Sequence, residues 1–431
     1  MTSNAKRLIR DGRLIDPHSG TDAVGDLLLD GGKIVSAGGR IEAPGAEVID
    51  ASGLVVAPGF IDMHVHLREP GQAYKETIIT GARAAARGGF TAVCAMPNTS
   101  PVNDSPEVTA WIREASAQAD VRVFPIAALT RGQKGVEPVD FDALLEAGAA
   151  AFSDDGRCIQ DEDLMRRVLE AARARGALVI DHCEDRALFG NGVVNDGPVA
   201  RRLNLPGIPA AAEDVIVARD IALAGRTGGR VHLAHLSTKG SVELVGEAKR
   251  RGLPVTAEVT PHHLLLTEDD VEAGGPNFKM NPPLRSAADA AALAAAVRDG
   301  IIDVFATDHA PHAVAEKAAG LRDAPFGIVG LETAIPLLLD RLVGRGVISL
   351  LRFAAMGSLR PAEILRWPDK GRLAPGAAAD VTILDLERTV TVDAARFASL
   401  GRNTPFDGWT LRGAPVMTIV GGRTVFSEMP C

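Results

Sequence analysis

Short apolar runs alternate with longer stretches of helical periodicity through the middle of the chain. Eight runs stand out, at residues 59–66, 90–98, 121–129, 149–155, 177–184, 230–237, 254–262 and 303–309. Alanine-rich segments dotted with arginine and glutamate lie between them, for example residues 75–89 and 161–176. This alternation predicts parallel βαβ units, and eight units in about 250 residues match a (β/α)₈ barrel. A doubly wound sheet would alternate in the same way, so the count alone leaves both open.

Both ends of the chain carry a different pattern, of short apolar runs with tight turns. These runs lie at residues 7–17, 26–39 and 46–53, and again at 379–393 and 414–428. Asp-Gly and Gly-Gly pairs between several of them predict hairpins. Of the two α/β architectures we favour the one whose size and count match, a (β/α)₈ TIM-type catalytic barrel formed by residues 57–367. Residues 1–56 and 368–431 are expected to form one small β-sandwich domain.

Composition and charge exclude several classes of protein. The 431 residues carry a net charge of −9, with no basic run and one tyrosine, which is a poor pattern for binding nucleic acid. The chain has neither an apolar stretch of membrane-spanning length nor a signal-peptide pattern. Its four cysteines are scattered, as in proteins of reducing compartments. We expect a cytoplasmic enzyme of small molecules, with no nucleic-acid or membrane partner.

Histidine and aspartate gather at the carboxyl ends of the predicted strands. His64 and His66 form a His-x-His pair on the first run, where residues two apart point to one face. The other candidate ligands end, or nearly end, the fourth, fifth, sixth and eighth runs: Asp155, His182, His235 and Asp308. Barrel enzymes collect their catalytic groups at these ends. Six ligands are more than one zinc ion needs, and they suit two divalent ions about 3.5–4 Å apart, bridged by a carboxylate and a hydroxide.

The identity of the bridging anion is constrained by the lysine content. Some related metal sites use a carboxylated lysine as the bridge. Between residues 101 and 230, however, the only lysine is Lys134, in a loop away from any strand end. The bridge therefore falls to Asp154 or Asp155, and spacing alone leaves both open. The other aspartate has a role in the turn before Gly156.

Eight segments carry recognisable motifs: PGFIDMHVHLREPG (58–71), AMPNT (95–99), FSDDG (152–156), HLST (235–238), EVTPHH (258–263), FKMNPPLR (278–285), ATDHAPH (306–312) and PFGIVGLET (325–333). Together they resemble the type I bacterial dihydroorotases of the amidohydrolase superfamily. The likeness covers nearly the whole chain. PGFIDMHVH alone marks only the superfamily, whereas HVHLREPG together with MPN and KMNPPLR is much more specific.

The resemblance implies a zinc-dependent cyclic amide hydrolase. Its reaction would be the reversible cyclisation of N-carbamoyl-L-aspartate to L-dihydroorotate, in de novo pyrimidine (UMP) biosynthesis. Two zinc ions per chain are implied, one held by His64, His66 and Asp308 and the other by His182 and His235. Asp155 would bridge them in place of a carboxylated lysine. A metal-bridging hydroxide would be the nucleophile, and Asp308 the proton carrier.

The resemblance also implies which residues contact the substrate. They are His66, Arg68, Asn98, Asn281, His312 and the backbone near Phe326 and Gly327. Arg68 and Asn98 are expected to hold the carboxylate that does not react, because a guanidinium binds a carboxylate through two hydrogen bonds. In contrast, His232 lies three residues before His235 on the same predicted strand, and we expect it to face away from the ligands.

Two alternative functions stay open. Hydantoinases, dihydropyrimidinases and allantoinases share the barrel and paired metals, but they usually carry the modified lysine and need no carboxylate clamp. Other dihydroorotase-like chains are non-catalytic partners of aspartate transcarbamoylase, and those chains lose zinc ligands that this sequence keeps. As partners of this chain, a homo-oligomer and a complex with aspartate transcarbamoylase are both open.

Overall fold

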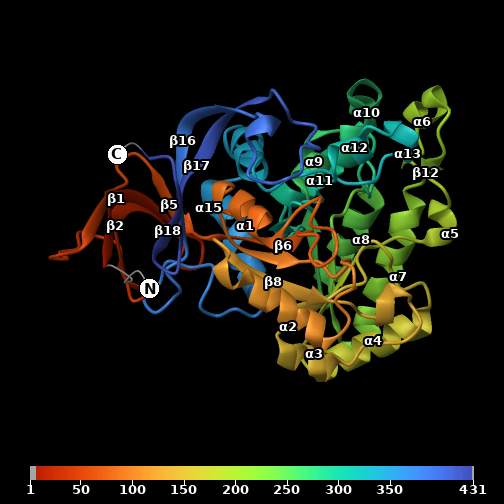
Figure 1. Cartoon of the computed structure of the whole chain (residues 1–431), viewed down its shortest axis with the longest axis horizontal. Helices are drawn as coiled ribbons and strands as arrows, with labels where there is room; N and C mark the ends of the chain where they lie inside the picture. The colour runs from red at the N-terminus through yellow and green to blue at the C-terminus, as the bar shows by residue number, and fades with distance from the viewer. Residues whose placement is uncertain (1–5, 430–431) are drawn as a thin grey trace.

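The computed structural model of the chain describes residues 6–429. A barrel of parallel strands surrounded by helices forms the larger part of the molecule, and a second sheet lies beside it (Figure 1). That second sheet combines strands from the beginning and the end of the sequence. Among residues 6–429, no helix is both long enough and apolar enough to cross a membrane.

The eight central strands are confirmed, each inside the apolar run that predicted it. They are β6 (Phe60–Val65), β7 (Phe90–Ala95), β8 (Arg122–Ala127), β9 (Ala151–Phe152), β10 (Leu178–Asp181), β13 (Arg230–Leu233), β14 (Val255–Val259) and β15 (Val304–Phe305). They pair in parallel in this order from β6 to β15. A bridge between Val65 and His309 joins the two ends, where the His66 N–H donates to the His309 carbonyl at 2.8 Å. This closure favours the barrel over the doubly wound sheet.

Helices cover the outside of the barrel between successive strands. They are α1 (Ile78–Arg87), α2 (Pro106–Ala115), α3 (Phe141–Ala147), α4 (Glu162–Ala174), α7 (Ala211–Thr227), α8 (Lys239–Arg250) and α11 (Ala287–Arg298). The sequence of α4 shows why such a segment becomes helical. The Asp161 carboxylate accepts from the Leu164 N–H at 2.7 Å and caps the first turn. Leu164, Val168 and Ala172 then recur at helical spacing and are buried.

Shorter elements lie in the connections at the carboxyl ends of the strands and after the eighth strand. The connections contain α5 (Arg186–Phe189), β11 (Val194–Asn195), α6 (Pro198–Leu203), β12 (Gly207–Ile208), α9 (Pro261–Leu265), α10 (Glu268–Gly274), α12 (Val314–Lys317) and α13 (Gly320–Asp323). After the barrel come α14 (Ala334–Leu338), α15 (Leu350–Ala354) and α16 (Arg360–Ile364).

The predicted β structure built from both termini is confirmed. Its strands are β1 (Arg7–Asp16), β2 (Thr21–Asp30), β3 (Lys33–Ala37), β4 (Glu47–Asp50), β5 (Val55–Pro58), β16 (Val381–Thr391), β17 (Thr410–Val420) and β18 (Arg423–Ser427). The early and late strands meet where β5 pairs with β16 in antiparallel register. Buried side chains from both groups, including Ile9, Leu27, Val56 and Ile383, form one apolar cluster.

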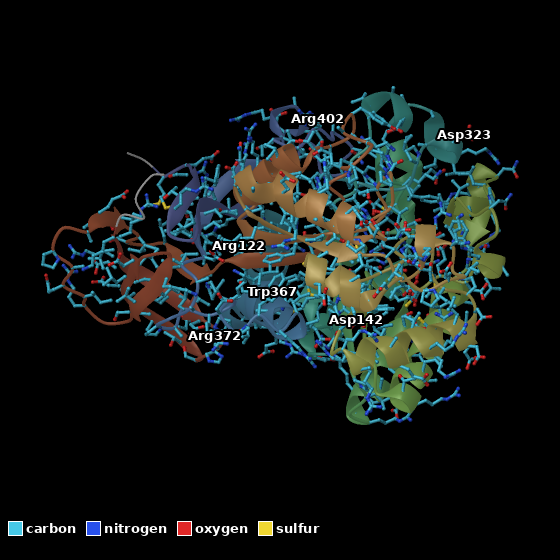
Figure 2. The ribbon with its side chains drawn as sticks, turned by 60° about the horizontal axis from the view of Figure 1, so that its bottom comes forward. Arg122, Asp142, Asp323, Trp367, Arg372 and Arg402 are labelled. Atoms are coloured by element: carbon cyan, nitrogen blue, oxygen red, sulfur yellow. The ribbon has the colours of Figure 1, made fainter. Side chains whose placement is uncertain are left out.

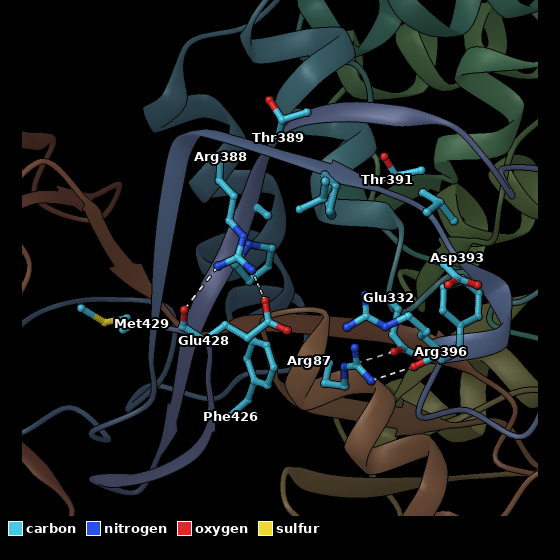
Figure 3. A pocket seen from close by; sticks show the side chains of 16 residues that line it. Arg87, Glu332, Arg388, Thr389, Thr391, Asp393, Arg396, Phe426, Glu428 and Met429 are labelled. Carbon is cyan, nitrogen blue, oxygen red and sulfur yellow. Dashed lines mark hydrogen bonds and ion pairs between the residues drawn. The ribbon is translucent and has the colours of Figure 1, made fainter. Parts of the chain in front are cut away.

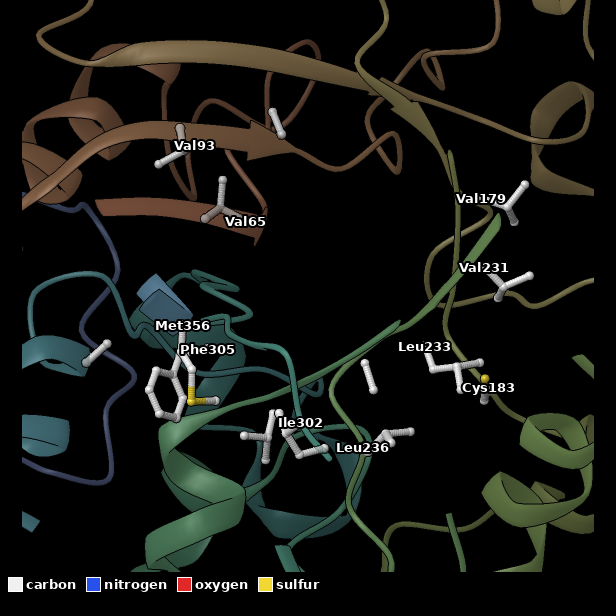
Figure 4. Close-up of a cluster of buried hydrophobic side chains, with 14 of the residues drawn as sticks. Val65, Val93, Val179, Cys183, Val231, Leu233, Leu236, Ile302, Phe305 and Met356 are labelled. Atoms are coloured by element: carbon white, nitrogen blue, oxygen red, sulfur yellow. The ribbon is translucent and has the colours of Figure 1, made fainter. Parts of the chain in front are cut away.

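Alternate residues of the barrel strands serve two separate apolar layers. Ala92 and Cys94 of β7 belong to a cluster with Ile126 and Ile180. Val93, between them, belongs to the larger cluster that includes the helices (Figure 4). Strands buried on both faces read as continuous apolar runs rather than as alternating ones, which is why the sequence located them so directly.

A buried carboxylate with two basic partners joins the barrel to the terminal sheet. The Asp380 carboxylate accepts from the Arg122 guanidinium at 3.1 Å and from the Lys370 ammonium at 2.8 Å. Trp367 stacks against Phe124 nearby, with ring centroids 4.1 Å apart, and Figure 2 shows Arg122 and Trp367 near this boundary. Arg122 begins β8, so this contact lies at the amino end of the barrel, opposite the end where the candidate ligands were predicted.

Candidate active site

The structure brings the six candidate metal ligands together at the carboxyl end of the barrel. His64 is on β6, and the others follow the ends of their strands: His66 after β6, Asp155 after β9, His182 after β10, His235 after β13 and Asp308 after β15. All six are buried. Residues far apart in the sequence meet here because the ends of parallel strands share one rim of the barrel.

The Asp155 carboxylate lies among all four imidazoles. Its Oδ1 is 3.3 Å from His64 Nε2, 3.7 Å from His182 Nδ1 and 3.9 Å from His235 Nε2. Its Oδ2 is 3.5 Å from His66 Nε2. One carboxylate thus lies within 4 Å of a ring nitrogen of each histidine, three of them on Oδ1 and His66 on Oδ2, a placement that suits a bridging anion.

Asp308 completes a second group with the first two histidines. Its Oδ1 is 3.0 Å from His66 Nε2 and 3.6 Å from His64 Nε2. Within residues 6–429, the buried His64 Nε2 has no hydrogen-bond partner. Ligand atoms of His64, His66 and Asp308, and likewise of His64, Asp155 and His235, lie within 4.8 Å of one another. Imidazole and carboxylate donors at this spacing fit a divalent transition metal.

The electrostatics of the cluster favour added positive charge. Burial raises the pKa of Asp155, but His64, His182 and His235 lower that pKa by more and hold it well below its usual range. Burial lowers the pKa of His182, yet the Asp155 and Glu184 carboxylates raise it to about 10. Buried carboxylates therefore stabilise positive charge here, whether it is carried by a proton or by a metal ion.

Asp154 points away from the cluster. Its carboxylate accepts from the Leu129 N–H at 2.8 Å and from the Thr130 N–H at 3.1 Å, and it also accepts from the Thr130 hydroxyl. These contacts tie the loop after β9 to the loop after β8. Of the two aspartates left open by spacing, Asp155 faces the histidines and Asp154 holds the turn.

Glu258, a buried carboxylate on β14, was not among the residues predicted from the sequence. Its Oε1 lies 2.7 Å from His64 Nδ1, and its Oε2 lies 3.1 Å from His232 Nε2. The prediction that His232 faces away from the ligands is wrong, because it contacts the carboxylate that orients His64. A carboxylate that accepts the Nδ1 proton turns Nε2 toward the cluster. One signal was available, since Glu258 is the only charged residue in the apolar run 254–262.

Asn98 orients the second histidine. Its Oδ1 is 2.8 Å from His66 Nδ1, and its amide nitrogen donates to Asp155 Oδ2 at 3.1 Å. From the resemblance, Asn98 was expected to hold the substrate carboxylate. The structure adds contacts to His66 and Asp155, so this side chain holds two ligand residues in position relative to each other.

A cavity of about 210 Å³ opens beside the ligand cluster. Its lining contains every residue predicted to contact the substrate, namely His66, Arg68, Asn98, Asn281, His312, Phe326 and Gly327. The size suits a small metabolite, since sites for drug-sized ligands are usually about 300–1,000 Å³.

Arg68 is the most unusual charge in this cavity. It is 8% exposed, and among residues 6–429 no carboxylate lies within ion-pair distance of it. Its Nε donates to the Pro311 carbonyl at 3.1 Å. Burial lowers the pKa of Arg68, which reflects the cost of keeping its charge out of water. A buried guanidinium without a partner carboxylate is suited to bind an anionic ligand.

Backbone conformation sets the positions of three of these side chains. Arg68, His235 and Asp308 have φ angles of 62°, 30° and 48°, in the left-handed region that non-glycine residues rarely adopt. Conformations of this kind cost about 1–3 kcal/mol each and concentrate at functional sites. The surrounding fold therefore compensates an unfavourable backbone at the cavity.

His312 is neutral in the cavity wall. Burial, together with the positive charges of Arg68 and Lys75, lowers the pKa of His312 to about 2. Its Nε2 donates to the Phe326 carbonyl at 2.8 Å, and its Nδ1 lies 3.4 Å from Lys75 Nζ. Gly327 has a φ of 130°, and a Cβ there would lie 2.7 Å from the Ala310 Cβ. Only glycine fits this close approach.

Glu184, which was not predicted from the sequence, and His263 support the opposite wall. Asn281 donates to Glu184 Oε2 at 2.6 Å, and Glu184 Oε2 lies 3.5 Å from His182 Nε2. His263 Nε2 donates to the Pro282 carbonyl at 2.9 Å, next to Asn281. These contacts couple the position of Asn281 to that of a candidate metal ligand.

A second, larger groove lies between the barrel and the terminal sheet (Figure 3). Its volume is about 640 Å³. Two of its three arginines are paired, because Arg87 lies 3.5 Å from Glu332 and Arg388 contacts Glu428. No histidine or cysteine is among the described residues that line it. The smaller cavity with the ligand cluster is therefore the candidate active site.

Comparisons with family models and curated proteins agree with one another. A model described as Dihydro-orotase-like matches residues 53–241, and one described as Amidohydrolase family matches residues 198–426. A dihydroorotase from Pelotomaculum thermopropionicum is 53% identical over 98% of this chain and 99% of its own length. A dihydroorotase from Anaeromyxobacter dehalogenans is 53% identical over 97% of this chain and 98% of its own.

Similar solved structures have the same architecture. The L-hydantoinase (dihydropyrimidinase) of Arthrobacter aurescens aligns with a TM-score of 0.89 at 27% identity, over 98% of this chain and 96% of its own. The dihydropyrimidinase of Brevibacillus agri aligns with a TM-score of 0.86 at 26% identity, over 98% of this chain and 95% of its own.

The contact between Glu258 and His64 yields a prediction about metal affinity. Glu258→Gln keeps the shape of the side chain but removes the charge that accepts the His64 Nδ1 proton. We expect the affinity for a divalent metal to fall by about 10- to 100-fold, measured by competition with a chromophoric chelator. The matched control is Glu243→Gln, on the exposed face of α8. Equal affinities of the two variants would contradict this role.

Proposed function

The chain belongs to the dihydroorotase family of the amidohydrolases, and from this premise we propose that it interconverts N-carbamoyl-L-aspartate and L-dihydroorotate. This family of hydrolases is metal-dependent, and the reaction would serve de novo pyrimidine biosynthesis. One observation carries the choice of substrate. The unpaired, buried guanidinium of Arg68 lies in the same cavity as the histidine and aspartate cluster, as a carboxylate-bearing cyclic amide requires.

The proposed cofactor is a pair of zinc ions. His64, His66 and Asp308 would hold one ion, His182 and His235 the other, and Asp155 both. The proposal is supported by the Asp155 carboxylate among the four imidazoles and by the unpartnered His64 Nε2. When bound, two such ions lower the pKa of a water toward neutrality and polarise a carbonyl.

No lysine takes the bridging place in this proposal. Among the described residues, none lines the cavity. Lys134, the lysine in the stretch where a carboxylated one would be sought, is exposed in the loop before α3. Asp155 is therefore the proposed bridge.

Asp308 is the proposed proton carrier. Burial raises its pKa, but the hydrogen bond to His66 and the nearby histidines lower that pKa by more, so the carboxylate is ionised. In hydrolysis Asp308 would accept the proton of the attacking water and deliver it to the ring nitrogen that leaves. Ring closure would run the same transfer in reverse, beginning with protonated Asp308.

The remaining cavity residues would hold the substrate. Arg68 can bind the unreactive carboxylate through two N–H groups, which fixes orientation as well as charge. Asn98, Asn281 and His312 present polar groups around the same cavity, and the backbone at Phe326 and Gly327 forms its wall. His66 would contact both the metal and the substrate. Holding the ring in one orientation brings its amide bond to the metal cluster.

A cyclic amidase of the hydantoinase type is the second candidate. The TM-score of 0.89 to an L-hydantoinase favours it. The identity of 53% to proteins named dihydroorotase favours the first candidate, as do Arg68 and the absence of a bridging lysine. The two candidates differ in whether the substrate carries a carboxylate.

A substrate panel separates these candidates. Purified protein loaded with zinc should hydrolyse dihydroorotate with a kcat/KM at least about 100-fold above that for hydantoin or allantoin, because a buried, unpaired guanidinium discriminates strongly against ligands without the anion. The measurement is initial rate at matched concentrations. Faster turnover of hydantoin or allantoin would contradict the proposal, as would no turnover of dihydroorotate by metal-loaded protein.

The role of Arg68 can be tested directly. Arg68→Ala should lose about 2–5 kcal/mol of transition-state binding, which lowers kcat/KM for dihydroorotate by about 30-fold or more. Metal content should stay unchanged, because Arg68 contacts no ligand residue in the proposed set. Arg83→Ala, on the exposed face of α1, is the matched control. A kcat/KM of Arg68→Ala within twofold of this control would refute the carboxylate assignment.

A further inference from the structure

One wall of the candidate active-site cavity is a backbone segment that is hydrogen-bonded on the side away from the cavity. Pro325, Phe326 and Gly327 follow α13, and the last two line the cavity. The segment has no regular secondary structure. Its position must therefore be set by contacts from other parts of the chain.

Lys317, the last residue of α12, supplies the main contact. It is 5% exposed, and its ammonium donates to the carbonyls of Lys279 at 3.2 Å, Pro325 at 3.0 Å and Gly327 at 3.0 Å. An ammonium has three N–H donors and no acceptor, so three carbonyls satisfy it fully. Among residues 6–429, no carboxylate lies within ion-pair distance of this nitrogen.

Asn403 also hydrogen-bonds to this backbone segment. The Asn403 amide nitrogen donates to the carbonyls of Gly327 and Ala310, each at 3.0 Å. Its Oδ1 accepts from the His312 N–H at 3.1 Å. The Gly327 carbonyl thus accepts from both Asn403 and Lys317. The two sides of the cavity wall, at Ala310–His312 and Pro325–Gly327, are fixed relative to each other.

We propose that Lys317 is a positioning residue, whose ammonium holds the Pro325–Gly327 backbone in the arrangement that the bound substrate contacts. The inference rests on the proposed function, because it takes Phe326 and Gly327 as part of the substrate site. It assigns to a residue outside the cavity a role in substrate affinity rather than in bond cleavage.

Proton loss would weaken this contact. Burial, with a smaller effect of the Lys279 charge, lowers the pKa of Lys317 to about 7. The neutral amine keeps two N–H donors and turns a lone pair toward the third carbonyl, which loses its donor. The ammonium is present below pH 7 and is lost as pH rises through about 7. Substrate affinity should therefore fall above neutral pH.

The charged groups around Lys317 do not reverse the lowering of its pKa. Lys279 directs its ammonium to the Arg322 carbonyl at 2.8 Å, and Glu316 on the same helix pairs with Lys75 at 3.0 Å. His312 is neutral, and Arg402 adds a further positive charge across a neighbouring pocket. Positive neighbours favour the neutral amine, so they add to the effect of burial.

Stability should move the opposite way with pH. A free lysine has a pKa of about 10.4, so between about pH 7 and 10 the unfolded chain binds a proton at this position that the folded chain does not. Folding stability from Lys317 then rises with pH over that window. If Lys317 acted only on stability, the folded state would become more stable as pH rises and substrate affinity would not fall. If Lys317 positions the cavity wall, substrate affinity falls as pH rises.

The test compares Lys317→Met with Lys134→Met, a control in an exposed loop. At pH 6.5, Lys317→Met should raise KM for dihydroorotate about tenfold, the loss of one charged hydrogen bond, with kcat changed less than about threefold. Zinc content should be unchanged. The wild-type KM should rise between pH 6.5 and 8.5, and the KM of Lys317→Met should stay flat over that range.

Two results would overturn the inference. One is a wild-type KM that does not change between pH 6.5 and 8.5. This measurement needs only the wild-type protein, so it tests the inference even if Lys317→Met does not fold. The other is a folded Lys317→Met whose KM matches that of Lys134→Met. Either result leaves an active dihydroorotase and the proposed function intact. A wild-type protein that fails to hydrolyse dihydroorotate would instead reject the proposed function and this inference with it.

Discussion

The buried Asp155 carboxylate among four imidazoles is the interaction on which the rest of the site depends. Charges without water must be compensated, and here the compensation comes from four imidazoles, on β6 and on the loops that follow β6, β10 and β13. The barrel closes beside this point, at the bridge between Val65 and His309, next to His66 and Asp308. The contact that closes the sheet therefore also brings His66 and Asp308 next to each other.

Contacts behind the ligands give the cluster its orientation. Glu258 and Asn98 each bind the Nδ1 side of a histidine and leave Nε2 facing Asp155 and Asp308. His232 in turn contacts Glu258. The same arrangement recurs in the cavity wall, where Asn403 and Lys317 donate hydrogen bonds to the backbone carbonyl of Gly327. Sequence motifs identify the residues that line the cavity, and the residues behind them fix their orientation.

The sequence predicted the barrel and the gathering of the ligands because both follow from local pattern. Strands buried on two faces are apolar runs, and residues at their ends must share one rim. The partners of those residues were not predictable in this way. Glu258 lies 194 positions from His64. Asp154 differs from Asp155 in function because its carboxylate accepts hydrogen bonds from the Leu129 and Thr130 N–H groups, about 25 positions earlier in the chain. Such pairings depend on tertiary structure, which spacing does not encode.

Titration of metal-free protein with zinc tests the central claim most directly. If Asp155 joins two ions as proposed, hydrolysis of dihydroorotate should increase with added zinc and reach its plateau at two ions per chain. A plateau at one ion per chain, or full activity before any metal is added, would contradict this account of the site.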